Sequence, residues 1–131
     1  MINYGRLATE RRKFMKLSKI KEILDAEVMA GADMLETEVD SAFGSDLMSD
    51  VLAFVNDRVL LLTGLVNPQV VRTAEMMDIS AIVFVRGKQP DETVIALAES
   101  KGITILTTAH TRYVACGRLY NEGLTGDEKE V

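Results

Sequence analysis

The sequence predicts an α/β protein with a mostly parallel sheet of four to five strands and helices on both faces, in three layers. Continuous apolar runs such as RVLLLTG (58–64) and ISAIVFV (79–85) are typical of strands that are buried on both sides. These runs alternate with amphipathic segments, which is the pattern of right-handed βαβ units. At 131 residues, 47% of them hydrophobic, the chain has the length of one domain and can bury a core without a metal or a disulfide.

The first third of the chain predicts one helix, one strand and an ambiguous stretch. Residues 1–14 form an N-terminal appendage with few apolar positions. In KLSKIKEILDAEVMAG (16–31) the apolar residues recur at helical spacing near Ser18, a suitable N-cap, and the closing AEVMAG predicts a short strand. MLETEVDSAF (34–43) alternates like a strand on a polar background and stays ambiguous between strand and loop.

Two further helices are predicted around the strand at 58–64. GSDLMSDVLAFV (44–55) predicts a helix that Ser45 caps, with an apolar face that includes Leu47 and Val51. NPQVVRTAEMMD (67–78) predicts a helix with Asn67 as N-cap and Pro68 at the first helical position, where its missing N–H costs nothing.

The last third predicts a helix, a strand and a closing helix. DETVIALAESKG (91–102) begins with acidic residues, which cap a helix and suit its N-terminal dipole. ITILTT (103–108) is a strand and HTRYVACGRLYNEG (110–123) is the closing helix. The domain therefore spans 15–124, and a polar tail follows at 125–131.

The charge of the chain is unevenly distributed. The formal net charge is −5, yet residues 1–21 carry seven basic side chains and one acidic side chain, so the remainder is strongly acidic. Nucleic-acid binding rests on the neutralisation of phosphates, so an acidic body argues against it. The basic arm is interpreted as a solvated helix or extension, and contact with an acidic partner is the alternative.

The cysteine count and the apolar runs restrict the compartment. A single cysteine, Cys116, excludes an internal disulfide and fits a reducing compartment, so we expect a cytoplasmic protein. No apolar run reaches the ~20 residues of a membrane helix, and the N-terminus has no signal core, so we expect no membrane contact. Cys116 is interpreted as a small buried hydrophobe of the last helix. Without a cysteine cluster or HExxH no zinc site and no cofactor are expected.

Four loops are expected to converge, because the C-terminal ends of parallel strands meet at one edge of a sheet. They are residues 44–46, 63–64, 86–90 and 107–112. Glycines there permit close approach of the backbone, and basic side chains offer cations on an otherwise acidic body. The edge is therefore predicted to bind a small anion or nucleotide. The candidate ligand-binding residues are Thr63, Gly64, Arg86, Gly87, Lys88, Thr107, Thr108, His110, Thr111 and Arg112.

Several of these residues also have a structural interpretation. The Thr63-Gly64 turn lacks the lysine and glycine spacing of a phosphate-binding loop, so a plain strand-to-helix connection is the alternative. His110, the only histidine, is a phosphoryl acceptor or proton carrier in one interpretation and a ligand contact or helix cap in the other. Four oxygen-bearing residues of one predicted helix offer Mg²⁺ ligands or simply form a solvated face: Ser45, Asp46, Ser49 and Asp50.

From Met15 to about Tyr120 the chain resembles the DRTGG domain family, which is related in fold to the N-terminal domain of HPr kinase/phosphorylase. The resemblance rests on the order of KLSKIKEILDAEVMAG, AFGSDLMSDVLAF, a strand ending in TG, AEMMDISAIVF, ALAESKGITILTT and a Thr-rich start to the last helix. The namesake residues are mostly replaced. Leu65-Val66 stand where the family has Asp-Arg, and only Gly87 remains of its Thr-Gly-Gly. The resemblance implies a regulatory domain without catalysis of its own, similar to modules fused to CBS domains or to a pyrophosphatase.

The leading hypothesis is a stand-alone, non-enzymatic regulatory domain that senses a small anionic metabolite or nucleotide. Leu65-Val66 is expected to form an exposed apolar patch and to serve as a homodimer face. The alternative is an interaction module that docks on a partner enzyme or signalling protein through this patch or the basic arm. A further alternative is a phosphotransferase that uses His110.

Overall fold

The main sheet has five strands in the computed structural model, which describes residues 14–55 and 58–126. Four run parallel and lie side by side in chain order: β4 (Ser41–Gly44), β5 (Val59–Thr63), β6 (Ala81–Phe84) and β7 (Thr104–Thr107). The fifth, β2 (Glu27–Ala30), pairs antiparallel with β7 at one edge. Outside this sheet, β1 (Met15–Lys16) and β3 (Glu38–Val39) form a short antiparallel pair. The predicted mostly parallel sheet is confirmed.

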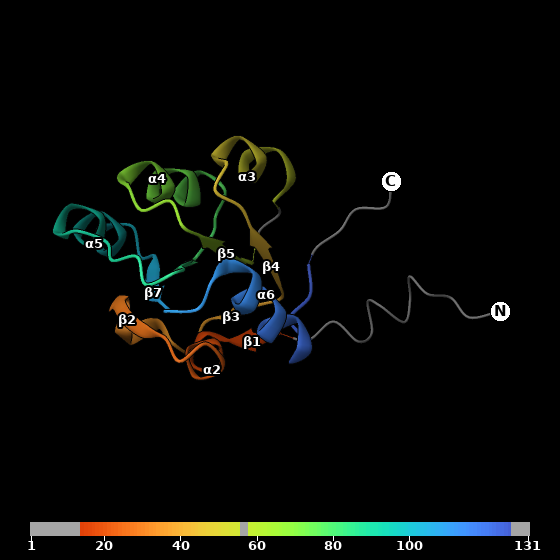
Figure 1. Ribbon diagram of the computed structural model, residues 1–131. Helices are drawn as coiled ribbons and strands as arrows, with labels where there is room; N and C mark the ends of the chain where they lie inside the picture. Colours follow the sequence, from red (N-terminus) through yellow and green to blue (C-terminus); the bar gives the residue numbers. More distant parts are fainter. Residues whose placement is uncertain (1–13, 56–57, 127–131) are drawn as a thin grey trace.

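Helices cover both faces of the sheet, as the sequence predicts (Figure 1). The three crossover helices lie on one face: α3 (Met48–Phe54), α4 (Pro68–Met76) and α5 (Glu92–Ser100). The other face carries α2 (Leu17–Ile23) and α6 (Arg112–Asn121). A short 3₁₀ helix, η1 (Ala32–Met34), follows β2. Consecutive crossovers of one hand along one row of strands place their helices on one face, which leaves the opposite face to α2 and α6.

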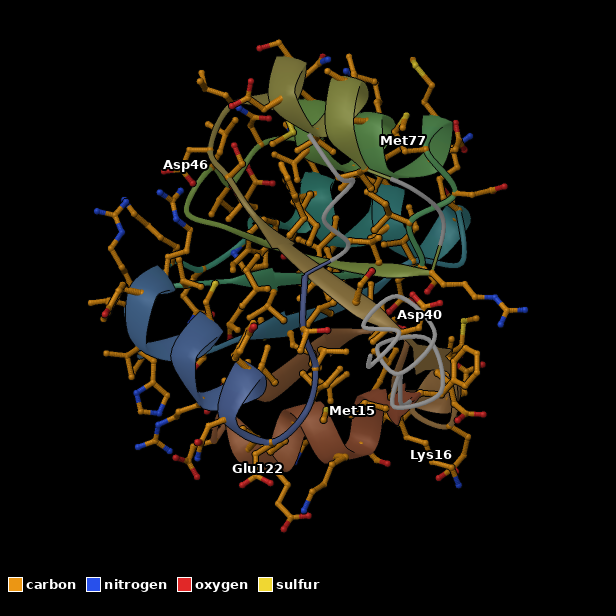
Figure 2. The ribbon with its side chains drawn as sticks, turned by 90° about the vertical axis from the view of Figure 1, so that its right-hand side faces the viewer. Met15, Lys16, Asp40, Asp46, Met77 and Glu122 are labelled. Carbon is orange, nitrogen blue, oxygen red and sulfur yellow. The ribbon has the colours of Figure 1, made fainter. Side chains whose placement is uncertain are left out.

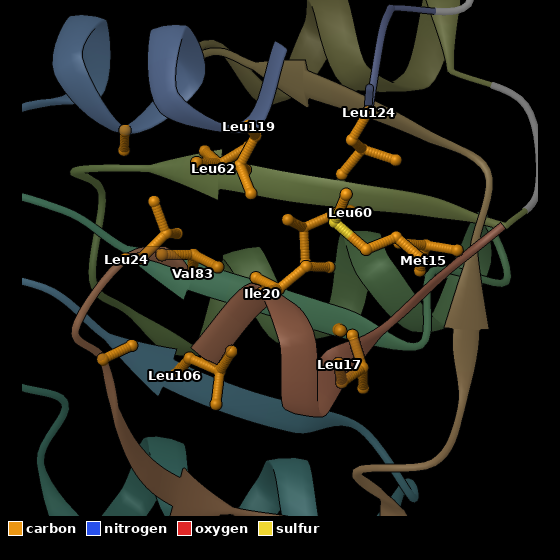
Figure 3. Packing of buried hydrophobic residues seen from close by; sticks show 14 of the residues in the cluster. Met15, Leu17, Ile20, Leu24, Leu60, Leu62, Val83, Leu106, Leu119 and Leu124 are labelled. Atoms are coloured by element: carbon orange, nitrogen blue, oxygen red, sulfur yellow. The ribbon is translucent and has the colours of Figure 1, made fainter. Parts of the chain in front are cut away.

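Alternation along each strand divides the core into two clusters. Leu60, Leu62, Val83 and Leu106 face α2 and α6, where they meet Ile20 and other apolar side chains (Figure 3). The intervening side chains face the crossover helices: Leu61, Ile82, Phe84 and Ile105. Because successive side chains of a strand point to opposite faces, a continuous apolar run supplies both clusters at once.

The helix starts of the second half follow the predicted capping chemistry. The side chain of Asn67 accepts a hydrogen bond from Val70 N at 3.3 Å, and Pro68 occupies the first helical position of α4. Asp91 caps α5 in the same way, with its Oδ1 3.0 Å from Val94 N. These caps satisfy backbone N–H groups that have no partner within the helix.

The two caps predicted in the first half are wrong. α2 begins two residues earlier than expected, with Lys16 as N-cap and without a side-chain cap, so Ser18 lies inside the helix. α3 begins at Met48, and Ser45 instead closes a local turn by accepting a hydrogen bond from Leu47 N at 3.0 Å. Leu47 was expected on the apolar face but is 61% exposed, whereas Val51 is buried. A serine hydroxyl can accept a hydrogen bond from a backbone N–H in a turn as readily as at a helix start. The position of a serine before an apolar segment is therefore not enough to predict an N-cap.

The ambiguous stretch 34–43 contains the last residue of η1, β3 and most of β4. β4 is an edge strand of the main sheet, and its free side is partly covered because Ala42 N donates to Thr125 O at 3.0 Å. The predicted appendage lies outside the described residues except for Phe14, as does the tail beyond residue 126. No helix in the described ranges is long and apolar enough to cross a membrane.

The prediction of an exposed apolar patch after β5 is wrong. Leu65 and Val66 are half-buried and pack against the core cluster beneath the crossover helices. Their apolar surface is therefore used within the chain, and the reason for expecting a dimer face at this turn is lost.

Leu62→Ala is expected to lower the free energy of unfolding by about 2–5 kcal/mol, the usual loss for a leucine buried between sheet and helices. Leu62 is 0% exposed in the cluster under α2 and α6. Leu52→Ala is the matched control, because Leu52 is 44% exposed on α3 and its loss is expected to cost less than about 1 kcal/mol. Urea unfolding of both variants measures the difference, and equal losses would contradict the assigned core.

Candidate functional site

The predicted loops meet at the C-terminal edge of the parallel strands. Backbone hydrogen bonds join the loop after β6 to the loop after β7: Arg86 N donates to His110 O at 2.8 Å, and Gly87 N donates to Thr108 O at 2.9 Å. These bonds hold the two loops in a fixed relation, because strand-end donors that lack a ladder partner find one in the neighbouring loop.

The carboxylate of Asp46 ties the loop after β4 to the end of β5 and to the start of α6. Its Oδ1 accepts hydrogen bonds from Gly64 N at 2.7 Å and from the Thr63 hydroxyl at 3.0 Å, and it lies 3.1 Å from Nη1 of Arg112. Figure 2 shows Asp46 at the end of the sheet above the first turns of α6. The Thr63-Gly64 turn therefore does hold an anionic group, but that group belongs to the chain itself.

These contacts favour the ionised form of Asp46. The hydrogen bond from Gly64 N is the largest cause that lowers the pKa of Asp46 below its ordinary value of 3.8, although burial acts in the opposite direction. The Thr63 hydroxyl and the positive charges of Arg112 and Arg86 lower the pKa further. Donors and cations around a carboxylate stabilise its charged form, so Asp46 is negative at neutral pH.

Arg86 occupies the first central position of a tight turn. The φ angles of Arg86 and Gly87 are 60° and 68°, and Lys88 N donates to Val85 O at 3.2 Å, as in a type I′ turn. The left-handed conformation costs a non-glycine residue roughly 1–2 kcal/mol, so another residue type would suit the backbone better. Gly64 leaves room for the guanidinium, because a Cβ there would lie 2.9 Å from Nη2 of Arg86.

Arg86 and Arg112 line one pocket of about 440 Å³ at this edge. Two guanidinium groups and the Asp46 carboxylate give the pocket lining one net positive charge. Arg112 is neutralised by Asp46, whereas no partner within residues 14–55 and 58–126 forms an ion pair with Arg86. The pocket is lined by Gly44, Asp46, Val85, Arg86, Arg112, Tyr113 and Cys116.

Four other candidate residues do not line this pocket: Thr107, Thr108, Thr111 and Lys88. Thr107 and Thr108 are buried, and the hydroxyl of Thr108 donates to Leu24 O at 2.7 Å. Thr111 is the N-cap of α6. Lys88 is exposed and is absent from the pocket lining.

His110 lies on the β2 side of the edge and has a partner that the sequence did not reveal. Its Nε2 is 3.5 Å from Oδ2 of Asp25, which also lies 3.8 Å from Nη1 of Arg118. Asp25 reaches this edge because β2 is antiparallel, so the turn before β2 meets the loops that follow the parallel strands. The sequence does show an aspartate in the turn between the predicted helix and the predicted strand. Its contact with His110 could not be predicted without knowing that β2 is antiparallel to β7.

Cys116 and Tyr113 are the pocket residues whose roles the sequence missed. Cys116 was expected to be buried but is half-buried, and its Sγ would lie 3.1 Å from a Cβ added at Gly44. Burial raises the pKa of the Cys116 thiol, and the nearby Arg112 charge opposes this. Tyr113 is 89% exposed beside Arg112. The sequence alone does not distinguish a tyrosine that lines a pocket from one on an ordinary exposed helix surface.

The predicted oxygen-rich helix face does not form. Ser45 and Asp46 precede α3, whereas Ser49 and Asp50 lie within it. Among the described residues, no three histidine, cysteine, aspartate or glutamate side chains lie close enough together to hold a metal ion.

The fold and the site define a small α/β domain of three layers with a cationic pocket at the C-terminal edge of its sheet. The chain belongs to the DRTGG domain family, because the family profile matches residues 19–121. The family inferred from the motif order is therefore confirmed. Among curated proteins none matches the chain at a significant level.

A similar solved structure contains the CBS and DRTGG domains of the regulatory region of Clostridium perfringens pyrophosphatase, complexed with an activator, diadenosine tetraphosphate. Its TM-score is 0.67 at 17% sequence identity, and the match covers 98% of this chain and 56% of that one. This chain thus spans little more than half of that structure. At this identity the likeness is one of fold.

Asp46→Asn is expected to make the protein less stable at pH 7 by up to about 1 kcal/mol, the range of half-exposed ion pairs. Because the pKa of Asp46 is lower in the folded state, its contribution is present above the ordinary value of 3.8 and is lost as the pH falls through the folded pKa. Urea unfolding of both proteins between pH 7 and pH 3 measures this. A stability difference that stays constant over that range would contradict the assigned hydrogen bonds.

Proposed function

We propose that this chain is a regulatory domain that binds a small anionic metabolite or nucleotide in the pocket between Arg86 and Arg112, and that it carries out no reaction of its own. The observation that carries the proposal is the pairing of charges in this pocket. Asp46 neutralises Arg112, while Arg86 keeps a guanidinium without an ion-pair partner among the described residues. A guanidinium of this kind suits bidentate contact with a phosphate or carboxylate.

The charge of the lining favours a ligand with one phosphate or carboxylate group. Asp46 remains ionised at neutral pH, so it repels part of any larger cluster of negative charge. Of the three charged groups, two attract an anion and one repels it, which suits a singly phosphorylated molecule better than a polyphosphate. The half-buried Cys116 gives the same pocket a less polar wall.

The similar structure supports a regulatory role through its own properties. It forms part of the regulatory region of a pyrophosphatase and was solved with a nucleotide activator. Because the likeness is one of fold, Arg86 and Arg112 of this chain are the residues that support an anionic ligand. A partner protein that receives the signal is part of this proposal.

Arg86→Asn is expected to weaken the binding of phosphorylated ligands by about tenfold, which corresponds to ~1.4 kcal/mol and lies near the lower end for a hydrogen bond to a charged group. Asparagine tolerates the left-handed backbone at this position, so the turn is retained. Binding is first detected as a rise in melting temperature across a set of nucleotides and sugar phosphates, and affinity is then measured by calorimetry.

Arg58→Asn is the matched control for this substitution. Arg58 has the same φ angle of 60°, and it lies before β5, at the opposite edge of the sheet, with its guanidinium 5.4 Å from the ring centre of Phe14. This variant removes the same charge from a position with the same positive φ and is expected to bind the ligand as the parent does. Equal weakening by both variants would assign the effect to net charge and remove Arg86 from the site.

Gly64→Ala tests the position of the Arg86 guanidinium without removing it. The added Cβ would lie 2.9 Å from the flexible end of Arg86, so the side chain must move, while the cost to folding is expected to stay below about 1 kcal/mol. We expect weaker ligand binding with a nearly unchanged urea midpoint. Binding that survives the substitution would show that the ligand does not use the guanidinium in its present place.

A further inference from the structure

The outer face of α6 carries a second hollow, which adjoins the cationic pocket. This hollow, called here the α6 hollow, has a volume of about 390 Å³ and is lined by Tyr113, Cys116, Gly117, Tyr120 and Asn121. Tyr113 and Cys116 also line the pocket that holds Arg86 and Arg112. The two spaces therefore adjoin each other along the side of one helix.

The two tyrosine side chains that line the α6 hollow are largely exposed to solvent, so neither ring is packed into the core. Tyr113 is 89% exposed and Tyr120 is 64% exposed. With Gly117 they recur at spacings of four and three residues, so the three positions share one face of the helix. Two aromatic side chains on one face, with a glycine between them, form an open cleft with ring surfaces at its ends.

Gly117 gives this cleft its floor. It lies in the middle of α6, where glycine is less favourable than alanine. An added Cβ would meet nothing within 4 Å, so close packing does not require glycine here. The consequence of its missing side chain is the open space between the two tyrosines.

We propose that the α6 hollow receives the heteroaromatic base of a nucleoside phosphate whose phosphate contacts Arg86 and Arg112. This inference rests on the proposed anion site and narrows its ligand to nucleotides. Aromatic side chains stack on nucleobases because every base has a flat π-face. Tyr113 follows Arg112 directly in the helix, so a ligand that places its phosphate against the guanidinium groups brings its base to the ring of Tyr113.

The experiment compares AMP, ribose 5-phosphate and inorganic phosphate by calorimetry on the whole chain. We expect AMP to bind at least about tenfold more tightly than ribose 5-phosphate, which is within the range of one base stacked on an aromatic side chain. Gly117→Leu and Tyr120→Leu, at positions of the α6 hollow that do not line the cationic pocket, are expected to reduce AMP binding towards the level of ribose 5-phosphate while ribose 5-phosphate binding stays unchanged. Val114→Leu, at a 42% exposed position of α6 outside the hollow, is expected to leave both affinities as they are.

The possible failures are distinguishable. If ribose 5-phosphate and AMP bind with equal affinity, the anion site stands and the base site is overturned. If none of the three ligands binds at millimolar concentration, the anion site itself fails and the base site with it. Sedimentation of the same variants tests whether a second copy of this chain, and not a base, occupies the α6 hollow. If Gly117→Leu changes the oligomeric state without changing the preference for AMP, the α6 hollow is a contact between copies of this chain and the proposal is wrong.

Discussion

The arrangement of charges at the C-terminal edge of the sheet depends on the contacts of the Asp46 carboxylate. It accepts hydrogen bonds from the end of β5 through Gly64 N and Thr63, and it pairs with Arg112 at the start of α6. Strand ends leave backbone donors without ladder partners, and a carboxylate satisfies them while it fixes a cation. The side chain of Asp46 is 49% exposed, so each contact contributes modestly to stability. Its larger effect is geometric, because it sets where Arg112 points and leaves Arg86 as the guanidinium available for an external anion.

The local charge of this edge is opposite to that of the whole chain. The chain carries a formal net charge of −5, whereas the pocket lining carries one net positive charge from two arginines and one aspartate. At 0.1 M salt, charges are screened beyond about 10 Å, so the acidic body has little influence inside the pocket. Recognition at such a site takes place at contact distance, through hydrogen bonds rather than through long-range attraction. The planar guanidinium of Arg86 is the group best suited to that task, since its donors match two oxygens of one phosphate.

The sequence was sufficient for the parts of the structure that follow from periodicity and capping. The buried strand predicted within 58–64 and caps such as Asn67 and Asp91 are local features, and the structure confirms the strand at 59–63 and both caps. The convergence of the loops was also predictable, because it follows from parallel strands. The Asp46 contacts were not, since they join residues 17 and 18 positions apart through side-chain directions that no local pattern contains. Asp25 was missed for a topological reason, because only the antiparallel direction of β2 brings it beside His110.

The turn after β5 does not supply the charges of this edge of the sheet. The resemblance to the family implies Asp-Arg in the turn after β5, whereas here Leu65 and Val66 stand in that turn and pack against the core. Charged side chains in this turn would be expected to point into solvent. The two half-buried apolar side chains instead pack the turn against the core beneath the crossover helices. The charges that surround Gly64 are supplied instead by Asp46 from the preceding loop, by Arg86 from the next loop and by Arg112 from α6. The edge thus holds acidic and basic groups together although the turn after β5 is apolar, because two loops and the first residue of α6 bring them to one point.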